Sequence, residues 1–434
     1  MTGRIHPMHR SERRVAWVIQ VLVVIGILVV LVGDLLGGGA TDRPATDGTA
    51  AQTDVSDPAG STATTAIDAA PTTGATTGGT VGVSSTTGIP ATTVPVRTFT
   101  LVATGDIISH GAVAERAGAN VDEGWDYSEM FRRVRPILAG ADLALCHLES
   151  PLSMDDEDLS FSGTFRVPSS LADAIAGAGY DGCSLASNHA LDSGRSSVDA
   201  TLHHLRRVGL GTAGMADSAD AAGPAWYEPG GIRVAHLSYT DLMNGRDLPT
   251  DPPWLVGHLD PAGVEADVAA AVADGAEFVV VSLHWGEEYR VQPTDRQAML
   301  VDRLLAMPDL DLVLGHHAHV VQPVVRRDGK AAVIGLGNFL TNQPGDEENP
   351  CSACPPSTQD GFIAWFAVAD GADGPRVVDA GYVPTWVDRE HAFEIVPIGI
   401  GDPGQVDPAV LAESAARTAA VVEPGLRRLE FTAG

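Results

Sequence analysis

The chain has 434 residues, 44% of them hydrophobic, so it can bury a sizeable core in one large or two smaller domains. Asp and Glu number 56 against 27 Lys and Arg, which gives a formal net charge of −29. This balance argues against nucleic acid as a partner, because neutralising phosphates requires basic patches. A polyanionic substrate would have to be held by bound metal ions or by a few Arg side chains.

The N-terminus is typical of a membrane signal anchor. A basic segment, residues 1–14, precedes the apolar run Val15–Val32. About 18 residues at ~1.5 Å each span roughly the hydrocarbon thickness of a bilayer. Flanking Arg residues favour a cytoplasmic N-terminus. We therefore expect a transmembrane helix within residues 15–36 of a single-pass cell-membrane protein whose C-terminal part is extracellular; a cleaved signal peptide is the alternative.

Thr, Ala, Gly, Ser and Pro dominate residues 37–97. Such a segment cannot bury enough apolar surface to offset the entropy of ordering, so we expect a disordered linker or stalk. A folded domain is expected over residues 98–400. A C-terminal tail, residues 401–434, should follow with a helix at Pro408–Val422.

Strand and helix patterns alternate through the folded part. Strands are predicted at Phe99–Thr104, Leu143–Cys146, Gly182–Ala186, Ile232–Tyr239, Phe278–Leu283, Leu310–Leu314, Val320–Val325, Ala331–Leu336 and Phe362–Val368. Helices are predicted at Tyr127–Leu138, Leu171–Ala178, Val198–Val208, Val264–Ala273 and Arg296–Ala306. This alternation predicts a layered α/β fold, and such sheets bind ligands where their strands end.

Polar residues close five of the apolar runs. The five segments are Gly105-Asp106, Cys146–Glu149, Ser187–His189, Leu283–Gly286 and Gly315–His319. Carboxylates, an Asn carbonyl and neutral imidazoles are ligands that divalent transition metals accept. Together the segments predict a site for two divalent ions, with Mn, Fe and Zn all compatible, where water can be activated as a nucleophile at neutral pH.

The carboxylates and the first imidazole also have ordinary structural interpretations. Asp106 could cap a turn, and Glu149 could be a surface carboxylate at a strand end. A Glu that closes an apolar strand is nevertheless costly unless it is paired or metal-bound. His147 would share a strand face with Glu149, and there it could equally be a structural His or a ligand.

The remaining segments carry the other candidates. Asn188 offers a carbonyl ligand, and His189 can donate a proton to a leaving group while Asp192 orients its ring. His284 closes an apolar strand, where a buried His with a backbone partner is the alternative. The pair His317 and His319 can point one way toward the metal ions, and His316 between the strand and that pair is expected to point away.

These motifs resemble the CapA-type poly-γ-glutamate capsule synthesis family, which belongs to the calcineurin-like metallophosphoesterase superfamily. The matching segments are Gly105-Asp106, Leu148-Glu149, Asn188–Gly194, His284–Tyr289, Gly315–Val320 and Gly337–Phe339. The resemblance covers roughly residues 98–345. It implies a layered β-sandwich flanked by helices.

The resemblance also implies roles for these residues. One metal would be held by Asp106, Glu149 and His319, and a second by Glu149, Asn188, His284 and His317, with His189 as general acid. The superfamily usually has Asp-x-His in the first motif, where this chain has Asp106-Ile107-Ile108. It usually has Asn-Leu-Glu in the second, where this chain has His147-Leu148-Glu149. We hypothesise that His147 supplies the missing imidazole to the first metal.

The function implied is a membrane-anchored metal-dependent hydrolase or transferase in the metabolism of poly-γ-glutamate or a related anionic envelope polymer. Alternatives are a non-catalytic subunit of a membrane polymer-synthesis complex and a broad extracellular phosphoesterase. Cys351 and Cys354 could form a disulfide outside the membrane, whereas zinc binding by this pair alone lacks further thiolates. Cys146 and Cys183 lie in apolar runs and are expected to be buried thiols.

Overall fold

The computed structural model describes residues 96–247, 249, 251–345 and 350–430. The basic segment 1–14, the expected transmembrane segment 15–36 and all but the end of the predicted linker lie outside these residues. Within the described part of the chain, no helix has the length and apolar character needed to cross a bilayer. The described end of the linker already joins the fold, because Arg97 forms ion pairs with Glu277 and Asp370.

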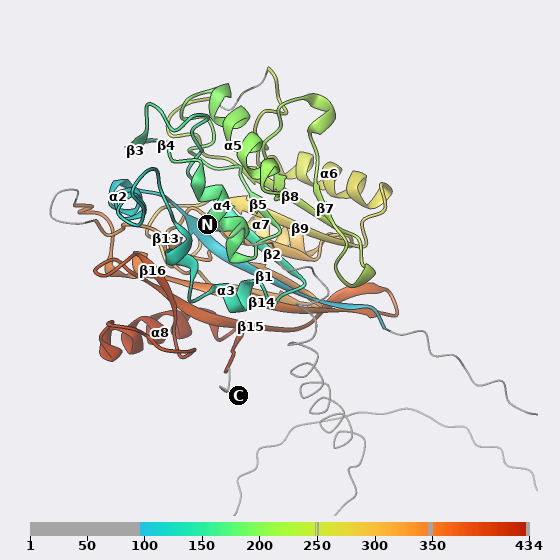
Figure 1. Ribbon diagram of the computed structural model, residues 1–434. Helices are drawn as coiled ribbons and strands as arrows, with labels where there is room; N and C mark the ends of the chain where they lie inside the picture. Colours follow the sequence, from blue (N-terminus) through green and yellow to red (C-terminus); the bar gives the residue numbers. More distant parts are fainter. Residues whose placement is uncertain (1–95, 248, 250, 346–349, 431–434) are drawn as a thin grey trace, which may run out of the picture. The chain divides into compact units, whose positions relative to one another are not determined.

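A larger and a smaller β-sheet form the centre of the fold (Figure 1). The larger sheet has the strand order β16-β15-β14-β1-β2-β5-β6, with β13 beside β1 and β17 beside β15. Its strands are β1 (Thr98–Ile107), β2 (Leu143–Leu148), β5 (Gly182–Ser184), β6 (Gly211–Ala213), β13 (Asn338–Leu340), β14 (Asp360–Gly371), β15 (Gly374–Asp388), β16 (Glu394–Pro397) and β17 (Arg427–Arg428). Strands β1, β2, β5 and β6 run parallel, and β14 to β16 extend the sheet antiparallel.

The smaller sheet has the order β11-β12-β10-β9-β8-β7. Its strands are β7 (Ala225–Tyr227), β8 (Val234–Thr240), β9 (Phe278–His284), β10 (Leu312–His316), β11 (Val324–Arg327) and β12 (Lys330–Val333). Strands β8, β9, β10 and β12 are parallel, and the edge strands β7 and β11 are antiparallel to their neighbours. A separate short hairpin pairs β3 (Ser160–Ser162) with β4 (Thr164–Arg166).

Helices cover the outer faces of the sheets. They are α2 (Gly111–Gly118), α3 (Arg135–Leu138), α4 (Ser170–Ala178), α5 (Arg195–Arg207), α6 (Pro261–Ala273), α7 (Asp295–Leu305) and α8 (Pro408–Val422). Apolar side chains of α4 and α5 pack on the larger sheet, those of α6 and α7 on the smaller, and a further core lies between the sheets. The predicted layered sandwich with flanking helices is therefore confirmed, and α8 has the predicted bounds.

Local sequence explains where the crossover helices begin. Helix α7 starts with a capping box, in which Thr294 Oγ1 accepts from the Gln297 amide at 3.1 Å and Gln297 Oε1 accepts from the Thr294 amide at 2.9 Å. Helix α6 starts with Asp260 as its N-cap and Pro261 at the first helical position. These helices return the chain across the sheet, so that β8, β9 and β10 all end at the same edge.

The predicted helix at Tyr127–Leu138 is wrong in extent. The structure has a 3-10 turn at Ser128–Phe131 and a separate short helix, α3. Pro136 lies in the first turn of α3, where its missing amide hydrogen costs nothing, but inside one continuous helix it would remove a hydrogen bond. Strand β15 was not predicted because Gly381 and Pro384 interrupt its pattern.

Cys146 and Cys183 are buried, as expected, but the expectation that they are thiols is wrong. The structure joins them in a disulfide between the neighbouring strands β2 and β5, where they are register partners with Cα atoms 4.4 Å apart. That separation is within the range for disulfides. A second disulfide joins Cys351 and Cys354, as we considered from the sequence for that pair.

Gly105 permits the close approach of two backbone segments beside Asp106. A Cβ atom at Gly105 would lie 2.0 Å from the carbonyl oxygen of Gly337. The same carbonyl accepts a hydrogen bond from the Asp106 amide at 2.9 Å. Any larger residue at position 105 must push these segments apart.

We predict that Gly105→Ala lowers the free energy of unfolding by about 1–3 kcal/mol, the usual cost of overpacking a close contact. Urea denaturation measures this. Gly177→Ala is the matched control, because that position lies within α4 with open space around its Cα. The control should be neutral or more stable by up to about 1 kcal/mol. Equal stabilities of the two variants would contradict the prediction.

Candidate metal centre

The candidate ligands continue the interior faces of the strands. On β10, Leu312 and Leu314 lie in the core between the sheets, and His316 occupies the next position of the same face. His147 at the end of β2 and His284 at the end of β9 hold equivalent positions and are fully buried. The apolar core between the sheets is thus replaced by polar side chains at the carboxyl ends of the strands.

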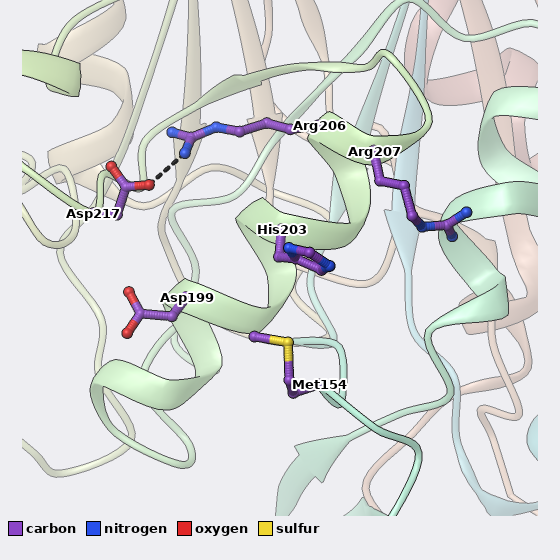
Figure 2. Close-up of a pocket in the computed structure, with 6 residues that line it drawn as sticks. All are labelled: Met154, Asp199, His203, Arg206, Arg207 and Asp217. Atoms are coloured by element: carbon purple, nitrogen blue, oxygen red, sulfur yellow. Dashed lines mark hydrogen bonds and ion pairs between the residues drawn. The ribbon is translucent and has the colours of Figure 1, made fainter.

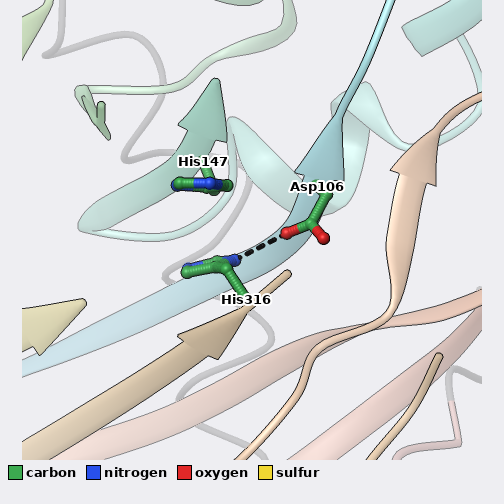
Figure 3. Close-up of side chains that lie close together, drawn as sticks. All are labelled: Asp106, His147 and His316. Carbon is green, nitrogen blue, oxygen red and sulfur yellow. Dashed lines mark hydrogen bonds and ion pairs between the residues drawn. The ribbon is translucent and has the colours of Figure 1, made fainter. Parts of the chain in front are cut away.

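Strand register aligns these side chains in two facing rows. In the larger sheet Asp106 pairs with His147, which pairs with Ser184. In the smaller sheet His316 pairs with His284. Across the gap, His316 Nδ1 lies 3.0 Å from an oxygen of Asp106, and His147 Nε2 lies 3.0 Å from His284 Nδ1. The rings of His147 and His316 stack with centroids 4.0 Å apart (Figure 3).

Glu149, which directly follows β2, lies where two ligand groups meet. One Glu149 oxygen lies 3.8 Å from His319 Nε2, and the other has no hydrogen-bond partner among the described residues. Ligand atoms of Asp106, Glu149 and His319 lie within 4.8 Å of one another, and so do those of His147, Glu149 and His284. The buried carboxylate common to both groups has the position expected of a bridging ligand.

Asn188 and His317 complete the far side of the cluster. Asn188 Oδ1 lies 3.0 Å from His284 Nε2, while its amide nitrogen donates to Asn244 Oδ1 at 3.0 Å. The His317 ring lies 4.7 Å from the His284 ring, centroid to centroid. Its Nδ1 is buried and has no hydrogen-bond partner within the described residues. All seven residues predicted as metal ligands therefore converge at one edge of the two sheets.

The prediction that His316 points away is wrong. Strand β10 ends at His316, and both His317 and His319 adopt left-handed backbone conformations, with φ of 84° and 54°. Simple alternation therefore stops at His316, whose ring faces Asp106. The alternate spacing of Leu312, Leu314 and His316 indicates that all three face the core between the sheets, so the sequence did contain the signal for this orientation. Backbone strain of this kind is typical of functional sites.

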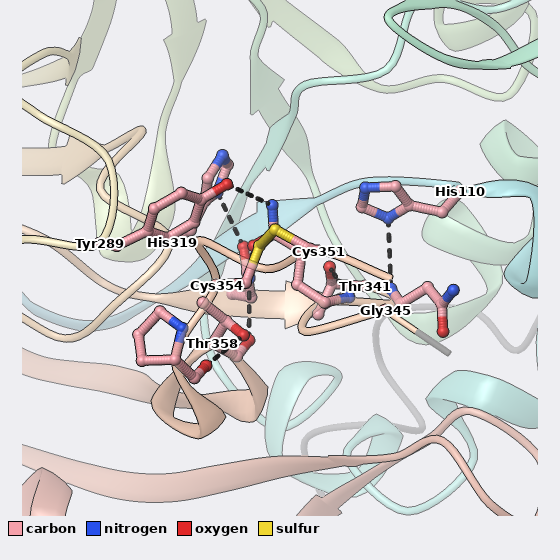
Figure 4. Close-up of a disulfide and its surroundings, with 12 residues drawn as sticks. His110, Tyr289, His319, Thr341, Gly345, Cys351, Cys354 and Thr358 are labelled. Atoms are coloured by element: carbon pink, nitrogen blue, oxygen red, sulfur yellow. Dashed lines mark hydrogen bonds between the residues drawn. A yellow bond between two sulfur atoms is a disulfide. The ribbon is translucent and has the colours of Figure 1, made fainter. Parts of the chain in front are cut away.

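Further residues support the ligands without having been singled out as candidates. Asn338, at the start of β13, places its Oδ1 3.0 Å from His319 Nδ1 and donates to the Thr358 carbonyl at 2.8 Å. Thr358 lies beside the loop closed by Cys351 and Cys354 (Figure 4). Glu288 forms another possible ligand group with His317 and His319, but its side chain is exposed. Asn338 and Glu288 both belong to the matching motifs.

Burial and charge set the protonation of the cluster. Burial holds the pKa of His147 and His284 well below the usual value and lowers that of His317 to about 3, so these rings are neutral at pH 7. Burial alone would raise the pKa of Asp106, but hydrogen bonds from two imidazoles hold it well below its usual range. Neutral imidazoles and an ionised carboxylate are the forms that bind metals.

The pair formed by Glu149 and His319 retains protons instead. Burial raises the pKa of Glu149 to about 8. Burial acts to lower the pKa of His319, yet the carboxylates of Glu149 and Asp106 outweigh it and raise that pKa to about 9. A divalent cation beside this pair would displace its protons. With two unsatisfied buried ligand atoms and a donor set of carboxylate, amide oxygen and imidazole, the residues fit divalent metal ions.

His189 and Asp192 lie together at the rim of the cluster. Asp192 Oδ2 accepts from His189 Nδ1 at 2.7 Å and from the Phe165 amide at 2.6 Å. The Phe165 ring packs edge-on against the imidazole, with centroids 4.7 Å apart. Asn244 Nδ2 also lies 3.3 Å from Nδ1 and 3.5 Å from Nε2 of this ring. Asp192 thus fixes the ring through Nδ1, and Nε2 is the nitrogen that has no carboxylate partner, as proton donation from Nε2 requires.

A separate cavity of about 520 Å³ lies beside α5 (Figure 2). Its lining residues are Met154, Asp199, His203, Arg206, Arg207 and Asp217. Both arginines are already paired, Arg206 with Asp217 and Arg207 with Asp173. None of the lining residues belongs to the metal cluster.

Comparison with known proteins shows sequence relatives and structural neighbours. The PGA biosynthesis protein CapA of Bacillus subtilis is 27% identical over 249 residues, 53% of this chain and 59% of that protein. The capsule biosynthesis protein CapA of Bacillus anthracis is 28% identical over 253 residues, 56% and 60% respectively. The chain thus spans about 60% of the length of these relatives. The solved calcineurin-like phosphoesterase YfkN of Bacillus subtilis is 12% identical, with a TM-score of 0.40, 75% of this chain and 98% of that chain being covered.

Residues 100–343, more than half of the chain, match the family described as bacterial capsule synthesis protein PGA_cap. The matched range runs from β1 to just beyond β13 and includes every strand end that contributes to the metal cluster. The predicted CapA-type resemblance is confirmed. The chain belongs to the bacterial capsule synthesis protein PGA_cap family.

Proposed function

We propose that this chain is a membrane-anchored, extracellular hydrolase or transferase that uses two divalent metal ions to act on poly-γ-glutamate or a related envelope polymer. The observation that carries the proposal is the buried Glu149 carboxylate, which lies close to His319 and Asp106 in one ligand group and to His284 in another and has one oxygen left unsatisfied. Asp106 and His319 would complete the first metal site with Glu149. Asn188, His284 and His317 would complete the second.

Two ions at these sites would polarise an amide or phosphoryl group and lower the pKa of water. The protein contributes the orientation of the ligands. Asp106 is held by the His317 amide at 3.1 Å and by the His316 ring, so its oxygens cannot rotate freely. Preorganised ligands of this kind spare the reaction the cost of rearranging the site.

His189 supplies the proton for the leaving group in this proposal. Its Nδ1–H remains bonded to Asp192, which stabilises the charged ring, while Nε2 delivers the proton. Asp192 is itself fixed by the Phe165 backbone amide, so the ring keeps one orientation. An amine or alkoxide leaving group needs such a donor at neutral pH.

The substrate assignment rests on the family and on charge. The relatives are named for PGA and capsule biosynthesis. A chain with net charge −29 repels an anionic polymer at long range, so attraction must come from cations inside the site. The two disulfides support an oxidising compartment, in agreement with an extracellular domain behind the N-terminal anchor.

Hydrolysis by the purified full-length chain with added Mn²⁺ tests the proposal. We expect cleavage of a γ-linked glutamate oligomer, and we expect His189→Ala to lower kcat by about 10²–10⁴-fold with both metals retained. His203→Ala, at an exposed position on α5, is the control and should remain fully active. Turnover of an aryl phosphodiester alone would favour a broad phosphoesterase. No turnover, with full function of His189→Ala in cells, would favour a non-catalytic subunit.

The shared carboxylate predicts that Glu149→Gln reduces bound metal from two ions per chain to one or none, because a neutral amide bridges two cations poorly. Elemental analysis after equilibrium dialysis measures the stoichiometry. Glu123→Gln, an exposed position, should bind as the unaltered chain does. Retention of both ions by Glu149→Gln would contradict the shared role.

Metal binding should release protons at neutral pH. In the metal-free protein, the raised pKa values of Glu149, about 8, and His319, about 9, keep at least one proton on the pair at pH 7. The metal requires both groups deprotonated, so affinity should rise as pH rises toward about 9. Calorimetry in buffers of different ionisation enthalpy should give a release of at least one proton per chain. A binding enthalpy independent of buffer would refute this prediction.

A further inference from the structure

Both ring nitrogens of His147 are already engaged by the protein. Nδ1 lies 2.8 Å from Ser184 Oγ, and Nε2 lies 3.0 Å from His284 Nδ1. The Ser184 hydroxyl is also placed to donate to the Cys146 carbonyl at 3.2 Å. All the side chains of this series are buried, with at most 4% of their surface exposed. They form a linear series of hydrogen bonds that runs from the Cys146 carbonyl through Ser184 and His147 to His284.

At its other end, His284 faces Asn188. Asn188 Oδ1 lies 3.0 Å from His284 Nε2, and the amide nitrogen of Asn188 is committed to Asn244. The atom of Asn188 next to His284 is therefore its carbonyl oxygen, which can only accept. His284 Nε2 and Asn188 Oδ1 are also the two atoms that the proposed second metal would bind.

The hydrogen bonds of this series can run in either of two directions, because each neutral imidazole carries one proton that can sit on either ring nitrogen. In one arrangement Ser184 donates to His147, His147 donates to His284, and His284 Nε2–H donates to Asn188. In the other arrangement Ser184 donates to the Cys146 carbonyl, His147 Nδ1–H donates to Ser184, and His284 Nδ1–H donates to His147. The second arrangement leaves lone pairs on both His284 Nε2 and Asn188 Oδ1, so both atoms could bind the same cation.

We propose that His147 is a positioning residue for the second metal: by accepting the Nδ1 proton of His284, it holds His284 in the tautomer whose Nε2 binds the ion. This inference rests on the proposed metal site, and it departs from the hypothesis that His147 is a ligand of the first metal. Both arrangements carry the same number of protons, so the change of tautomer needs no other reactant. The hydroxyl of Ser184, which can turn from His147 to Cys146, makes both arrangements possible.

Nitrogen-15 NMR of histidine-labelled full-length protein tests the tautomers directly. In the Zn²⁺-loaded chain we expect His284 and His147 to be protonated at Nδ1, with His284 coordinated through Nε2 and no coordination shift at either nitrogen of His147. In the metal-free chain we expect His284 to be protonated at Nε2. A coordination shift at His147, or a Zn²⁺-loaded His284 that keeps its proton at Nε2, would overturn the proposal.

Substitutions separate positioning from ligation. His147→Ala should keep two ions per chain and an unchanged number of imidazoles around Zn²⁺ in X-ray absorption spectra, with second-site affinity reduced about 10–100-fold. His147→Gln should recover most of that loss, because its amide oxygen can accept the His284 proton. His203→Ala should bind as the unaltered chain does. Loss of one imidazole and one ion from His147→Ala would make His147 a ligand.

The outcomes also separate this inference from the proposed function. An unaltered chain that binds both ions with the expected tautomers but cleaves no substrate supports the positioning role and removes the proposed catalysis. An unaltered chain that binds no divalent ion removes both.

Discussion

The structure depends on the register between parallel strands of two facing sheets. Apolar side chains of β2, β9 and β10 fill the space between the sheets. At the last inward-facing position of each strand, an imidazole takes the place of an apolar side chain. Because neighbouring strands are in register, Asp106, His147 and Ser184 form one row and His316 and His284 the other. A slip of one residue on any of these strands would turn its ligand away from the site.

Burial gives this cluster its chemical character. Polar groups taken out of water must be satisfied by hydrogen bonds or by ions. Most of the cluster satisfies itself, since Asp106 accepts from two His residues and His284 contacts His147 and Asn188. Two buried atoms of the cluster stay unsatisfied within the described residues: one oxygen of Glu149, which belongs to two ligand groups, and Nδ1 of His317, which belongs to a third. Asp106, His284 and Asn188 therefore belong both to the hydrogen-bonded network and to the proposed metal sites.

Much of this arrangement could be predicted from local patterns. Apolar runs ending in His284 and Glu149 indicated the strand ends, and the apolar pattern of Val264–Ala273 and Arg296–Ala306 indicated the crossover helices α6 and α7. Each of these signals lies within one short segment, so it can be recognised without knowing how the segments pack together. The orientation of His316 could also have been predicted, because it continues the spacing of Leu312 and Leu314. It was missed because alternation was counted from the loop residues His317 and His319, whose backbone leaves the strand.

Other features depend on contacts between distant segments. The pairing of Cys146 with Cys183 follows from the register of β2 and β5, 37 residues apart, which no local pattern encodes. The support of His319 by Asn338 likewise requires that β13 lie beside β1. The contact between His147 and His284 joins the two sheets across 137 residues. The sequence predicts which side chains are candidates for the site, whereas the partners that they contact depend on how the two sheets pack.

Anomalous diffraction from crystals grown with Mn²⁺ tests directly whether Glu149 joins two metal sites. We expect two anomalous peaks about 3.5–4 Å apart, with the Glu149 carboxylate between them, one peak beside Asp106 and His319 and the other beside Asn188 and His284. A single peak, or peaks that do not contact Glu149, would contradict this expectation.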